Sequence, residues 1–224
     1  ETEFSPVVVQ HPFTSSGIVV LPEKGGGDFM PLDITRDADS LQRWRNAVAS
    51  AIDHADNVFR IYMMVNKPYG LAFLKYTAPY LSKNDFSQIL SSAWIICEAP
   101  NNDPEVSMRK LVTMFQSADP QVLMDEDEYR DFQELDDPLT VYRGVTAYNA
   151  DCVRALSWTL DRQTAEWFAH RFGEDGTVYE AKIAKEHIYA LFNGRNESEV
   201  IVDPKYLTDI TEAQDMASDF DLSQ

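Results

Sequence analysis

The spacing of apolar side chains predicts that a long first part of the chain is helical. Between residues 37 and 135, apolar residues recur about every three to four positions, which is the period of an amphipathic α-helix. The clearest case runs through Leu41, Trp44 and Val48, and Asp37, Asp39 and Ser40 are available as caps. We therefore predict several helices over this range.

Capping residues indicate where the further helices begin. Ser82 or Asn84 could cap one of them. Asp103 followed by Pro104 predicts the start of another, because proline is favoured in the first turn of a helix. Pro120 then separates that helix from the next one along the chain.

The first 35 residues combine two short apolar runs, "VVV" and "GIVVLP", with proline and glycine. These runs predict short strands or extended arms. The stretch "EKGGGDF" predicts a flexible turn. It has neither the Lys-Ser/Thr ending of a phosphate-binding loop nor the spacing of a dinucleotide-binding fingerprint, so we assign it no binding role.

After Pro138 the pattern changes to short segments rich in β-branched and aromatic residues. Five of them predict strands: "LTVYRGV", "ALSWT", "GTVYEAKI", "HIYALF" and "EVIV". One helix, "DRQTAEWFAHRF", interrupts them, with Asp161 as its N-cap and Gly173 at its end. Helices followed by strands predict an α+β fold. We expect one compact domain, in which residues 1–136 form an extended arm and a helical region and residues 137–224 form a strand-rich core with an acidic tail.

The chain is strongly acidic, with a net charge of −18 over 224 residues. Such a surface repels the phosphate backbone of nucleic acids, so we expect no direct nucleic-acid binding. It favours a basic partner instead. The densest acidic segment, "DEDEYRDFQELDD", is typical of a solvated helix face and loop.

Several classes of function find little support in the sequence. No apolar run approaches the roughly 18 to 20 residues of a membrane helix, and the first ten residues lack the features of a signal peptide. The two cysteines and four histidines have no metal-binding spacing, and no Gly-x-Ser-x-Gly elbow indicates a serine hydrolase. We expect a protein of the cytoplasm, of the producing or the targeted cell, with no metal and no membrane contact. Secretion is the alternative, because the chain does not begin with Met.

One predicted strand carries an unusual charge. In "LTVYRGV", the alternation of a strand places Arg143 on the same face as Val141 and Val145. A buried guanidinium is costly unless an anion meets it. Two kinds of anion fit: an internal carboxylate, or the phosphate or pyrophosphate of a ligand, which the forked guanidinium is well shaped to bind. Gly144 beside it would let such a ligand approach the backbone closely.

Two further strand ends carry polar groups at regular spacing. The segment "SWT" places the hydroxyls of Ser157 and Thr159 on one face of a strand. In "NESEVIV", Glu197 and Glu199 are separated by one residue, so both carboxylates would project from one face. This pair is either a site or a solvated strand end, and its own sequence leaves both interpretations open.

In chain order, the arginine of "VYRGV", the Ser-x-Thr of "LSWT" and the Glu-x-Glu of "NESEVIV" resemble the ADP-ribosyltransferases of the Arg-Ser-Glu class. This class includes bacterial toxins and phage-encoded enzymes that modify host proteins. The resemblance covers residues 139–207. It implies an ADP-ribosyltransferase-like fold of two small β-sheets packed at a steep angle, with helices in front.

The resemblance also implies a role for each motif, with NAD as a substrate and no metal. Arg143 would hold the pyrophosphate and ribose side of NAD, and Gly144 would offer backbone groups to the nicotinamide amide. Ser157 would orient Glu199, which would grip the ribose and stabilise its cationic transition state. Glu197 would orient and deprotonate the acceptor, and a glutamate at this position implies arginine as the acceptor.

Neighbouring residues complete the expected site. Thr159, Trp158 and Trp167 would contact NAD, with core packing as the alternative for the two tryptophans. Acceptor recognition would fall to the segment that leads into the catalytic strand: Phe192, Asn193, Arg195, Asn196 and Glu197. The predicted function is mono-ADP-ribosyl transfer from NAD to a protein acceptor. The alternatives are NAD hydrolysis at the same site, or a catalytically inactive acidic protein that binds basic partners.

Overall fold

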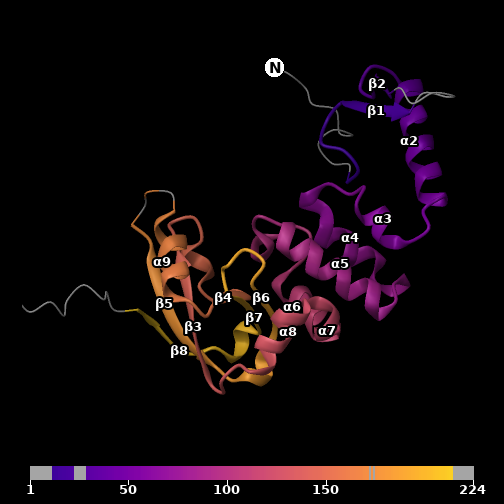
Figure 1. The fold of residues 1–224 in the computed structure, drawn as a ribbon. Coiled ribbons are helices and arrows are strands. Elements are labelled where there is room, and N and C mark those ends of the chain that lie inside the picture. The colour runs from indigo at the N-terminus through magenta and orange to yellow at the C-terminus, as the bar shows by residue number, and fades with distance from the viewer. Residues whose placement is uncertain (1–11, 23–28, 172, 174, 214–224) are drawn as a thin grey trace, which may run out of the picture. The chain divides into compact units, whose positions relative to one another are not determined.

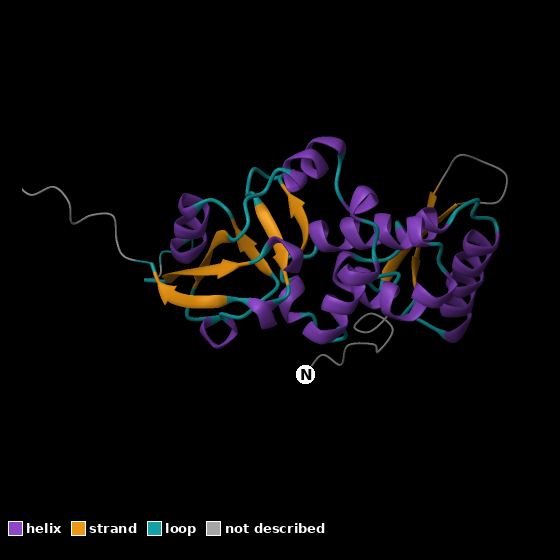
Figure 2. Ribbon diagram, turned by 90° about the horizontal axis from the view of Figure 1, so that it is seen from below, coloured by secondary structure: helices purple, strands orange, loops and turns teal. Residues whose placement is uncertain are grey.

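The structure is a computed structural model that describes residues 12–22, 29–171, 173 and 175–213. The chain forms two compact units, residues 1–100 and residues 101–224, and each has its own sheet. The described residues form eight α-helices and two antiparallel sheets, so the predicted α+β class is confirmed (Figure 2).

The first unit begins with a two-stranded hairpin. Strand β1 (Ile18–Pro22) pairs antiparallel with β2 (Phe29–Asp33) (Figure 1). One face of the hairpin packs on helix α2 (Ala38–Asp53), and Leu32 and Trp44 are buried in the resulting cluster. The strand predicted from "GIVVLP" is thus confirmed.

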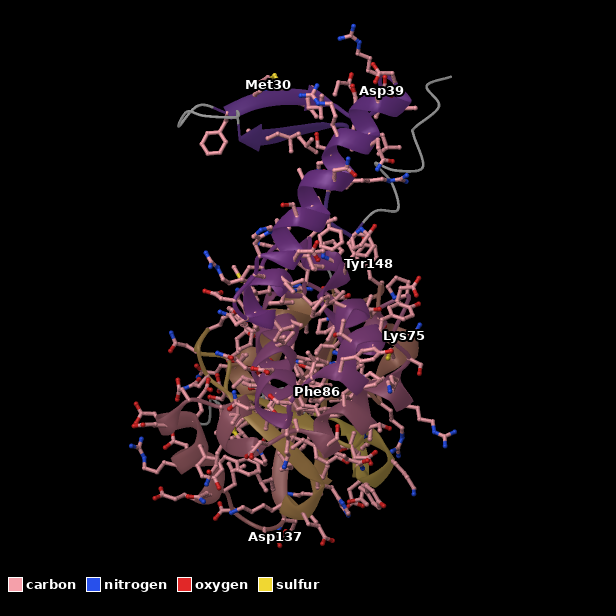
Figure 3. All side chains as sticks on the ribbon, turned by 90° about the vertical axis from the view of Figure 1, so that its right-hand side faces the viewer. Met30, Asp39, Lys75, Phe86, Asp137 and Tyr148 are labelled. Atoms are coloured by element: carbon pink, nitrogen blue, oxygen red, sulfur yellow. The ribbon has the colours of Figure 1, made fainter. Side chains whose placement is uncertain are left out.

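Helix α2 begins where the sequence predicted. Asp37 is its N-cap and accepts a hydrogen bond from the backbone N–H of Ser40 at 2.7 Å. Figure 3 marks the first turn of this helix by Asp39 and the neighbouring strand β2 by Met30. The apolar stripe predicted for the helix is the face that packs on the hairpin.

The rest of the first unit is helical. Its α-helices are α3 (Val58–Tyr62), α4 (Gly70–Thr77) and α5 (Lys83–Ile96), with 3₁₀ turns at Lys67–Tyr69, Ala78–Tyr80 and Pro100–Asn102. Ser82 is the N-cap of α5 and accepts from the backbone N–H of Asp85 at 3.0 Å, so the first of the two candidate caps is confirmed. Helices α4 and α5 pack together through fully buried residues that include Leu74 and Ile89.

The described residues of the second unit form four α-helices: α6 (Met108–Ser117), α7 (Pro120–Leu123), α8 (Glu126–Gln133) and α9 (Arg162–His170). It starts well before residue 137, and it includes α6, α7 and α8, which the sequence placed with the N-terminal region. Helix α9 has the predicted bounds. Asp161 caps its start, and beyond its end Gly173 adopts a φ of 70° and donates its N–H to the His170 carbonyl at 2.9 Å.

The predicted start of α6 is wrong. Asp103 and Pro104 do not open the helix, which begins at Met108 with Ser107 as its N-cap. Instead, the Asp103 carboxylate accepts the backbone N–H groups of Glu105 and Val106, both at 2.8 Å. Aspartate closes a non-helical turn by this same hydrogen bonding, so an Asp-Pro pair signals either structure.

Six strands form the sheet of the second unit. They are β3 (Leu139–Val145), β4 (Ser157–Thr159), β5 (Thr177–Ile183), β6 (Ile188–Phe192), β7 (Glu199–Val202) and β8 (Thr208–Glu212), joined in the order β6-β7-β4-β3-β5-β8. Short 3₁₀ turns lie between them at Ala150–Cys152, Lys185–His187 and Pro204–Tyr206. The first five strands confirm the predicted segments. Strand β8, "TDITE", is an edge strand that the sequence did not predict, because its residues are mostly polar and exposed.

The two halves of this sheet are joined at one point. Strands β3 and β5 align over seven residue pairs, and β4 and β7 over three, whereas β3 and β4 share the single pair Tyr142 and Thr159. The resemblance implied two small sheets packed at a steep angle. The second unit instead has one sheet made of two three-stranded halves that meet at this pair.

Helices cover both halves. Helix α9 packs on β3 and β5, beside which it lies in Figure 1, and α6, α7 and α8 contact β6. Strand β7 is buried over its whole length. Because β7 lies between β4 and β6, the catalytic strand expected from the sequence is an interior strand with fixed neighbours on both sides.

Three expected features lie outside the described residues: the run "VVV", nearly all of "EKGGGDF", and the acidic C-terminal tail. Among the helices of the described ranges, none combines the length and the apolar character that crossing a bilayer requires.

Candidate active site

The pairing of β4 with β7 brings Ser157 and Glu199 together. The register places Thr159 opposite Glu199 and Ser157 opposite Ile201, so Ser157 and Glu199 are diagonal neighbours on adjacent strands. The Ser157 hydroxyl donates to the Glu199 Oε1 atom at 2.5 Å. Glu199 is buried, with 7% of its surface exposed. Residues that are 42 positions apart in the sequence thus form a short, charge-assisted hydrogen bond.

Arg143 is hydrogen-bonded to the same end of β4. Its Nη1 atom donates to the backbone carbonyl of Ser157 at 2.6 Å. Its Nε is buried and, within the described residues, has no hydrogen-bond partner. Burial lowers the pKa of Arg143 below its ordinary value, and the charges of Cys152 and Glu199 act in the opposite direction. The buried Nε–H of the guanidinium is therefore an unused donor within the described residues. Glu199 acts on the guanidinium through its charge, as the alternative of an internal carboxylate expected.

Thr159 supports the site through the backbone. Its hydroxyl donates to the carbonyl of Glu197 at 2.6 Å and accepts the N–H of Asp161 at 3.0 Å. Thr159 itself is buried, with 6% of its surface exposed. We expected it to contact NAD, but the structure uses its hydroxyl to join the loop before β7 to the start of α9.

Two aromatic residues expected at the site are core residues. Trp158 is 2% exposed, and its indole N–H donates to the Ala155 carbonyl at 3.0 Å. It lies on the opposite face of β4 from Ser157, because successive side chains of a strand alternate. Phe192 is 4% exposed, on β6 opposite Glu199. Trp158 therefore follows the alternative of core packing, and Phe192 is a buried residue of β6 and not part of the exposed loop.

Gly144 also differs from its expected role. A Cβ atom added there would lie 2.1 Å from the carbonyl oxygen of Ala165 and 2.6 Å from the backbone nitrogen of Ala169. Both belong to α9. The close approach that requires a glycine at this position is therefore made by a helix of the protein and not by a ligand.

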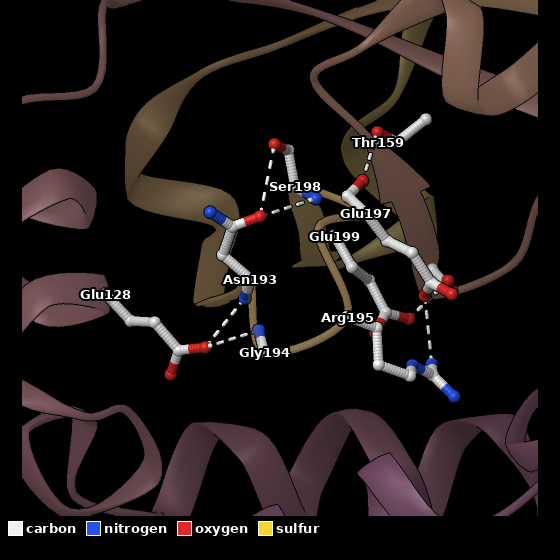
Figure 4. A network of polar contacts seen from close by, with 9 residues as sticks. Glu128, Thr159, Asn193, Gly194, Arg195, Glu197, Ser198 and Glu199 are labelled. Carbon is white, nitrogen blue, oxygen red and sulfur yellow. Dashed lines mark hydrogen bonds and ion pairs between the residues drawn. The ribbon is translucent and has the colours of Figure 1, made fainter.

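The segment Asn193–Ser198 is a tight loop between β6 and β7. Asn196 and Ser198 have φ angles of 56° and 44°, in the left-handed region that non-glycine residues rarely adopt. Hydrogen bonds hold this geometry: the Asn193 side-chain oxygen accepts the Ser198 N–H at 3.2 Å, and the Ser198 carbonyl accepts the N–H of Leu160 at 3.0 Å (Figure 4).

This loop changes the expected geometry of the glutamate pair. Strand β7 begins at Glu199, so Glu197 lies in the loop and is not on one strand face with Glu199. The Glu197 carboxylate is instead positioned by Arg195, whose Nη2 lies 3.0 Å from the Glu197 Oε2. The Glu197 side chain is 23% exposed, whereas Glu199 is buried. The two glutamates therefore occupy different environments, one partly exposed and one enclosed.

Sequence reasoning missed Glu128, which anchors the loop from α8. Its Oε1 accepts the backbone N–H groups of Asn193 at 2.6 Å and Gly194 at 3.2 Å, and its Oε2 accepts the N–H of Asp125 at 3.1 Å (Figure 4). Asp125 in turn accepts the Glu128 N–H, which completes a capping box. The Asp-x-x-Glu spacing signalled this box, but the acidic segment around it was interpreted as a solvated face.

The remaining predicted residues lie at the surface. Asn193, Arg195 and Asn196 are exposed in the loop. Trp167 is 61% exposed on α9 and packs edge-on against Phe168, with ring centroids 5.0 Å apart. No grouping of metal-ligating side chains was found in the part of the chain that the structure describes.

The arrangement has a definite chemical capability. A buried carboxylate is fixed by a hydroxyl and accompanied by a guanidinium with an unused donor, and a second, partly exposed carboxylate lies in the adjoining loop. Such a set can stabilise a developing cation and accept a proton from an incoming nucleophile. Comparisons of this chain with protein-family models, curated proteins and solved structures found no match.

Proposed function

We propose that this protein is a mono-ADP-ribosyltransferase that transfers ADP-ribose from NAD to an arginine of a protein acceptor. The observation that carries the proposal is the 2.5 Å hydrogen bond from Ser157 to the buried Glu199 carboxylate, with Arg143 bound to the backbone of the same serine. The resemblance to the Arg-Ser-Glu class rests on these same three side chains.

The chemistry explains why these groups serve the reaction. Nicotinamide in NAD is already cationic, so breaking its bond to the ribose C1′ atom needs no strong acid. It needs negative charge close to the ribosyl cation that develops in the transition state. Glu199 supplies this charge, Ser157 fixes its direction, and the Arg143 guanidinium, bound to the Ser157 carbonyl, is the cation for a pyrophosphate.

Glu197 is suited to the acceptor side of the reaction. Its carboxylate is partly exposed and already binds a guanidinium, that of Arg195. As an acceptor nitrogen forms its bond to C1′ and nicotinamide leaves with the electron pair of the broken bond, Glu197 takes the proton that this nitrogen loses. An arginine acceptor fits because a carboxylate and a guanidinium are matched in charge and shape.

The test is incubation of the protein and a cell lysate with NAD labelled in its ADP-ribose part. Labelled protein bands, and loss of nicotinamide release in the Glu199→Gln variant, are the expected results. Unchanged nicotinamide release in that variant would refute the assignment of Glu199. Free ADP-ribose without labelled protein would show NAD hydrolysis instead, and absence of NAD binding by calorimetry would identify an interaction protein.

A second variant separates the two glutamates. Glu197→Ala removes the proton acceptor but leaves the Ser157–Glu199 pair, so transfer to protein is lost while slow hydrolysis of NAD continues. Both rates are measured on the same sample, as protein label and as released nicotinamide. Transfer at the wild-type rate would rule out Glu197 as the acceptor-side base.

A further inference from the structure

The guanidinium that contacts Glu197 belongs to the protein itself. Arg195 lies in the loop between β6 and β7, and its Nη2 is 3.0 Å from the Glu197 Oε2. Figure 4 shows the Arg195 guanidinium on the side of the loop where the carboxylates of Glu197 and Glu199 lie. An arginine acceptor would have to place a guanidinium nitrogen at the same carboxylate. Arg195 therefore occupies the position that the proposed reaction requires of its substrate.

We propose that Arg195 is an internal acceptor and that the protein transfers ADP-ribose from NAD to this residue. In this reaction the bond between the ribose C1′ and the nicotinamide nitrogen breaks, and nicotinamide leaves with the electron pair. An Nη nitrogen of Arg195 forms the new bond to C1′, and Glu197 takes the proton that this nitrogen loses. The products are ADP-ribosylated Arg195, nicotinamide and one proton, so atoms and charge balance.

The environment of Arg195 allows it to react, because its side chain is 50% exposed and accessible to a ligand. To admit an external arginine at Glu197, Arg195 must leave this pair. Once modified, it can no longer form the same pair, because the transferred group occupies a guanidinium nitrogen. Self-modification therefore changes the acceptor side of the site while leaving the Ser157–Glu199 pair in place.

The chain offers a matched control for this inference. Arg130 on α8 is also exposed and ion-paired, with its Nη1 2.8 Å from Asp127 and its Nη2 3.3 Å from Asp131. Its partners are carboxylates of a helix surface and not of the candidate site. If exposure and ion pairing alone favoured modification, Arg130 would be labelled as readily as Arg195.

The inference rests on the proposed function, and one experiment separates the two. The purified full-length protein is incubated with NAD labelled in its ADP-ribose part, without any other acceptor. Nicotinamide release is measured, and the labelled peptide is mapped by mass spectrometry. We expect label on Arg195, its loss in Arg195→Lys, and its retention in Arg130→Lys. The labelled fraction should rise at the same rate at different protein concentrations, because the acceptor is in the same chain.

Each other outcome has a distinct meaning. Nicotinamide release with label on Arg130, on another residue or on none overturns the inference about Arg195 and leaves the transferase proposal standing. Absence of nicotinamide release overturns the transferase proposal and the inference with it. A labelling rate that rises with protein concentration shows transfer between molecules and so overturns Arg195 as an internal acceptor.

Discussion

The hydrogen bond between Ser157 and Glu199 orients a carboxylate that is largely shielded from water. Glu199 is 7% exposed, so its carboxylate depends on protein donors for stabilisation. The Ser157 hydroxyl is one such donor, at 2.5 Å. A hydrogen bond to a charged group is worth roughly 1.5–3 kcal/mol, more than one between neutral groups. The serine therefore fixes the direction of the glutamate side chain.

The Ser157→Ala substitution tests this role. Without the hydroxyl, the Glu199 carboxylate loses its direction and part of its stabilisation, so we expect nicotinamide release to fall by about tenfold to a hundredfold, in line with the loss of one charged hydrogen bond. Ser157→Thr keeps the hydroxyl on a strand that tolerates a β-branched residue, and it should restore most of the rate. A wild-type rate in Ser157→Ala would mean that the hydrogen bond has no part in the reaction.

At the scale of elements, the loop that carries Glu197 is held by a helix. Glu128 on α8 binds the N–H groups of Asn193 and Gly194 through one carboxylate oxygen and that of Asp125 through the other. Two loop residues adopt left-handed backbone angles, which cost about 1–3 kcal/mol each unless the surroundings impose them. Helix α8 supplies part of that constraint. Glu128 thus positions the loop that carries Glu197.

The Glu128→Ala substitution should affect protein transfer more than NAD hydrolysis. It removes the acceptor of two loop N–H groups, so the loop with Glu197 loses its fixed position while the Ser157–Glu199 pair remains. We expect the ratio of labelled protein to released nicotinamide to fall. Glu128→Gln keeps one oxygen for the loop and should restore this ratio.

A control variant separates loop anchoring from helix stability. Asp125→Ala removes the N-cap that accepts the Glu128 N–H at 2.8 Å, which costs about 1 kcal/mol of stability, but leaves the contacts of Glu128 to the loop. It should lower the melting temperature without changing the ratio of transfer to hydrolysis. An equal change of this ratio in Asp125→Ala and Glu128→Ala would show that Glu128 acts only through helix stability.

The contact between α9 and β3 leads to a prediction about stability. A methyl group at Gly144 would lie 2.1 Å from the Ala165 carbonyl oxygen, a backbone atom that cannot rotate away. Gly144→Ala should therefore lower the free energy of unfolding by about 1–3 kcal/mol or more, as overpacking does. Gly194→Ala is the matched control, because nothing lies within 4 Å of its added Cβ. Thermal unfolding of both variants checks this, and equal melting temperatures would contradict the packing.

At the scale of the whole molecule, the strands were predictable because each carries its own local pattern. The alternation in "LTVYRGV" and the apolar run "EVIV" depend on residues that face the core, and both are strands with the expected bounds. Strand β8 has no such pattern, since its ladder with β5 is made by the backbone of polar residues at an edge. The start of α6 was mispredicted because Asp103 closes a turn with the same hydrogen bonds that cap a helix.

The contacts of the candidate site were predictable where the pairing of strands brings the motifs together. They were less predictable where tertiary packing determines which side chains are buried. Ser157 and Glu199 meet because β4 and β7 pair. The orientations of Trp158 and Phe192 depend on which face of a strand is buried, and their motifs did not indicate it. The contact of Glu128 with the loop was missed because its partners are backbone N–H groups 65 and 66 residues away. No local sequence pattern indicates a contact over such a separation.

The extent of the second unit shows what the site needs in order to form. Besides Glu128, other residues before position 137 bind the strand region. Among them, the side-chain oxygen of Asn101 accepts the N–H of Leu156 at 2.9 Å, and the Met124 sulfur accepts that of Leu191 at 3.2 Å. All of them lie within residues 101–224. The compact unit, and not the strand-rich segment by itself, thus contains the contacts that hold β4, β6 and the loop.

Two fragments test this conclusion. Residues 101–224 include the candidate site with its supporting helices, so we expect this fragment to unfold cooperatively by circular dichroism and to release nicotinamide from NAD. Residues 137–224 lack α6, α7 and α8, which leaves the outer face of β6 uncovered and the loop without Glu128, so this shorter fragment should show no cooperative transition. A cooperative transition in the shorter fragment would place the boundary where the sequence first suggested it. Failure of the longer fragment to fold would mean that residues 1–100 are required for the stability of the second unit.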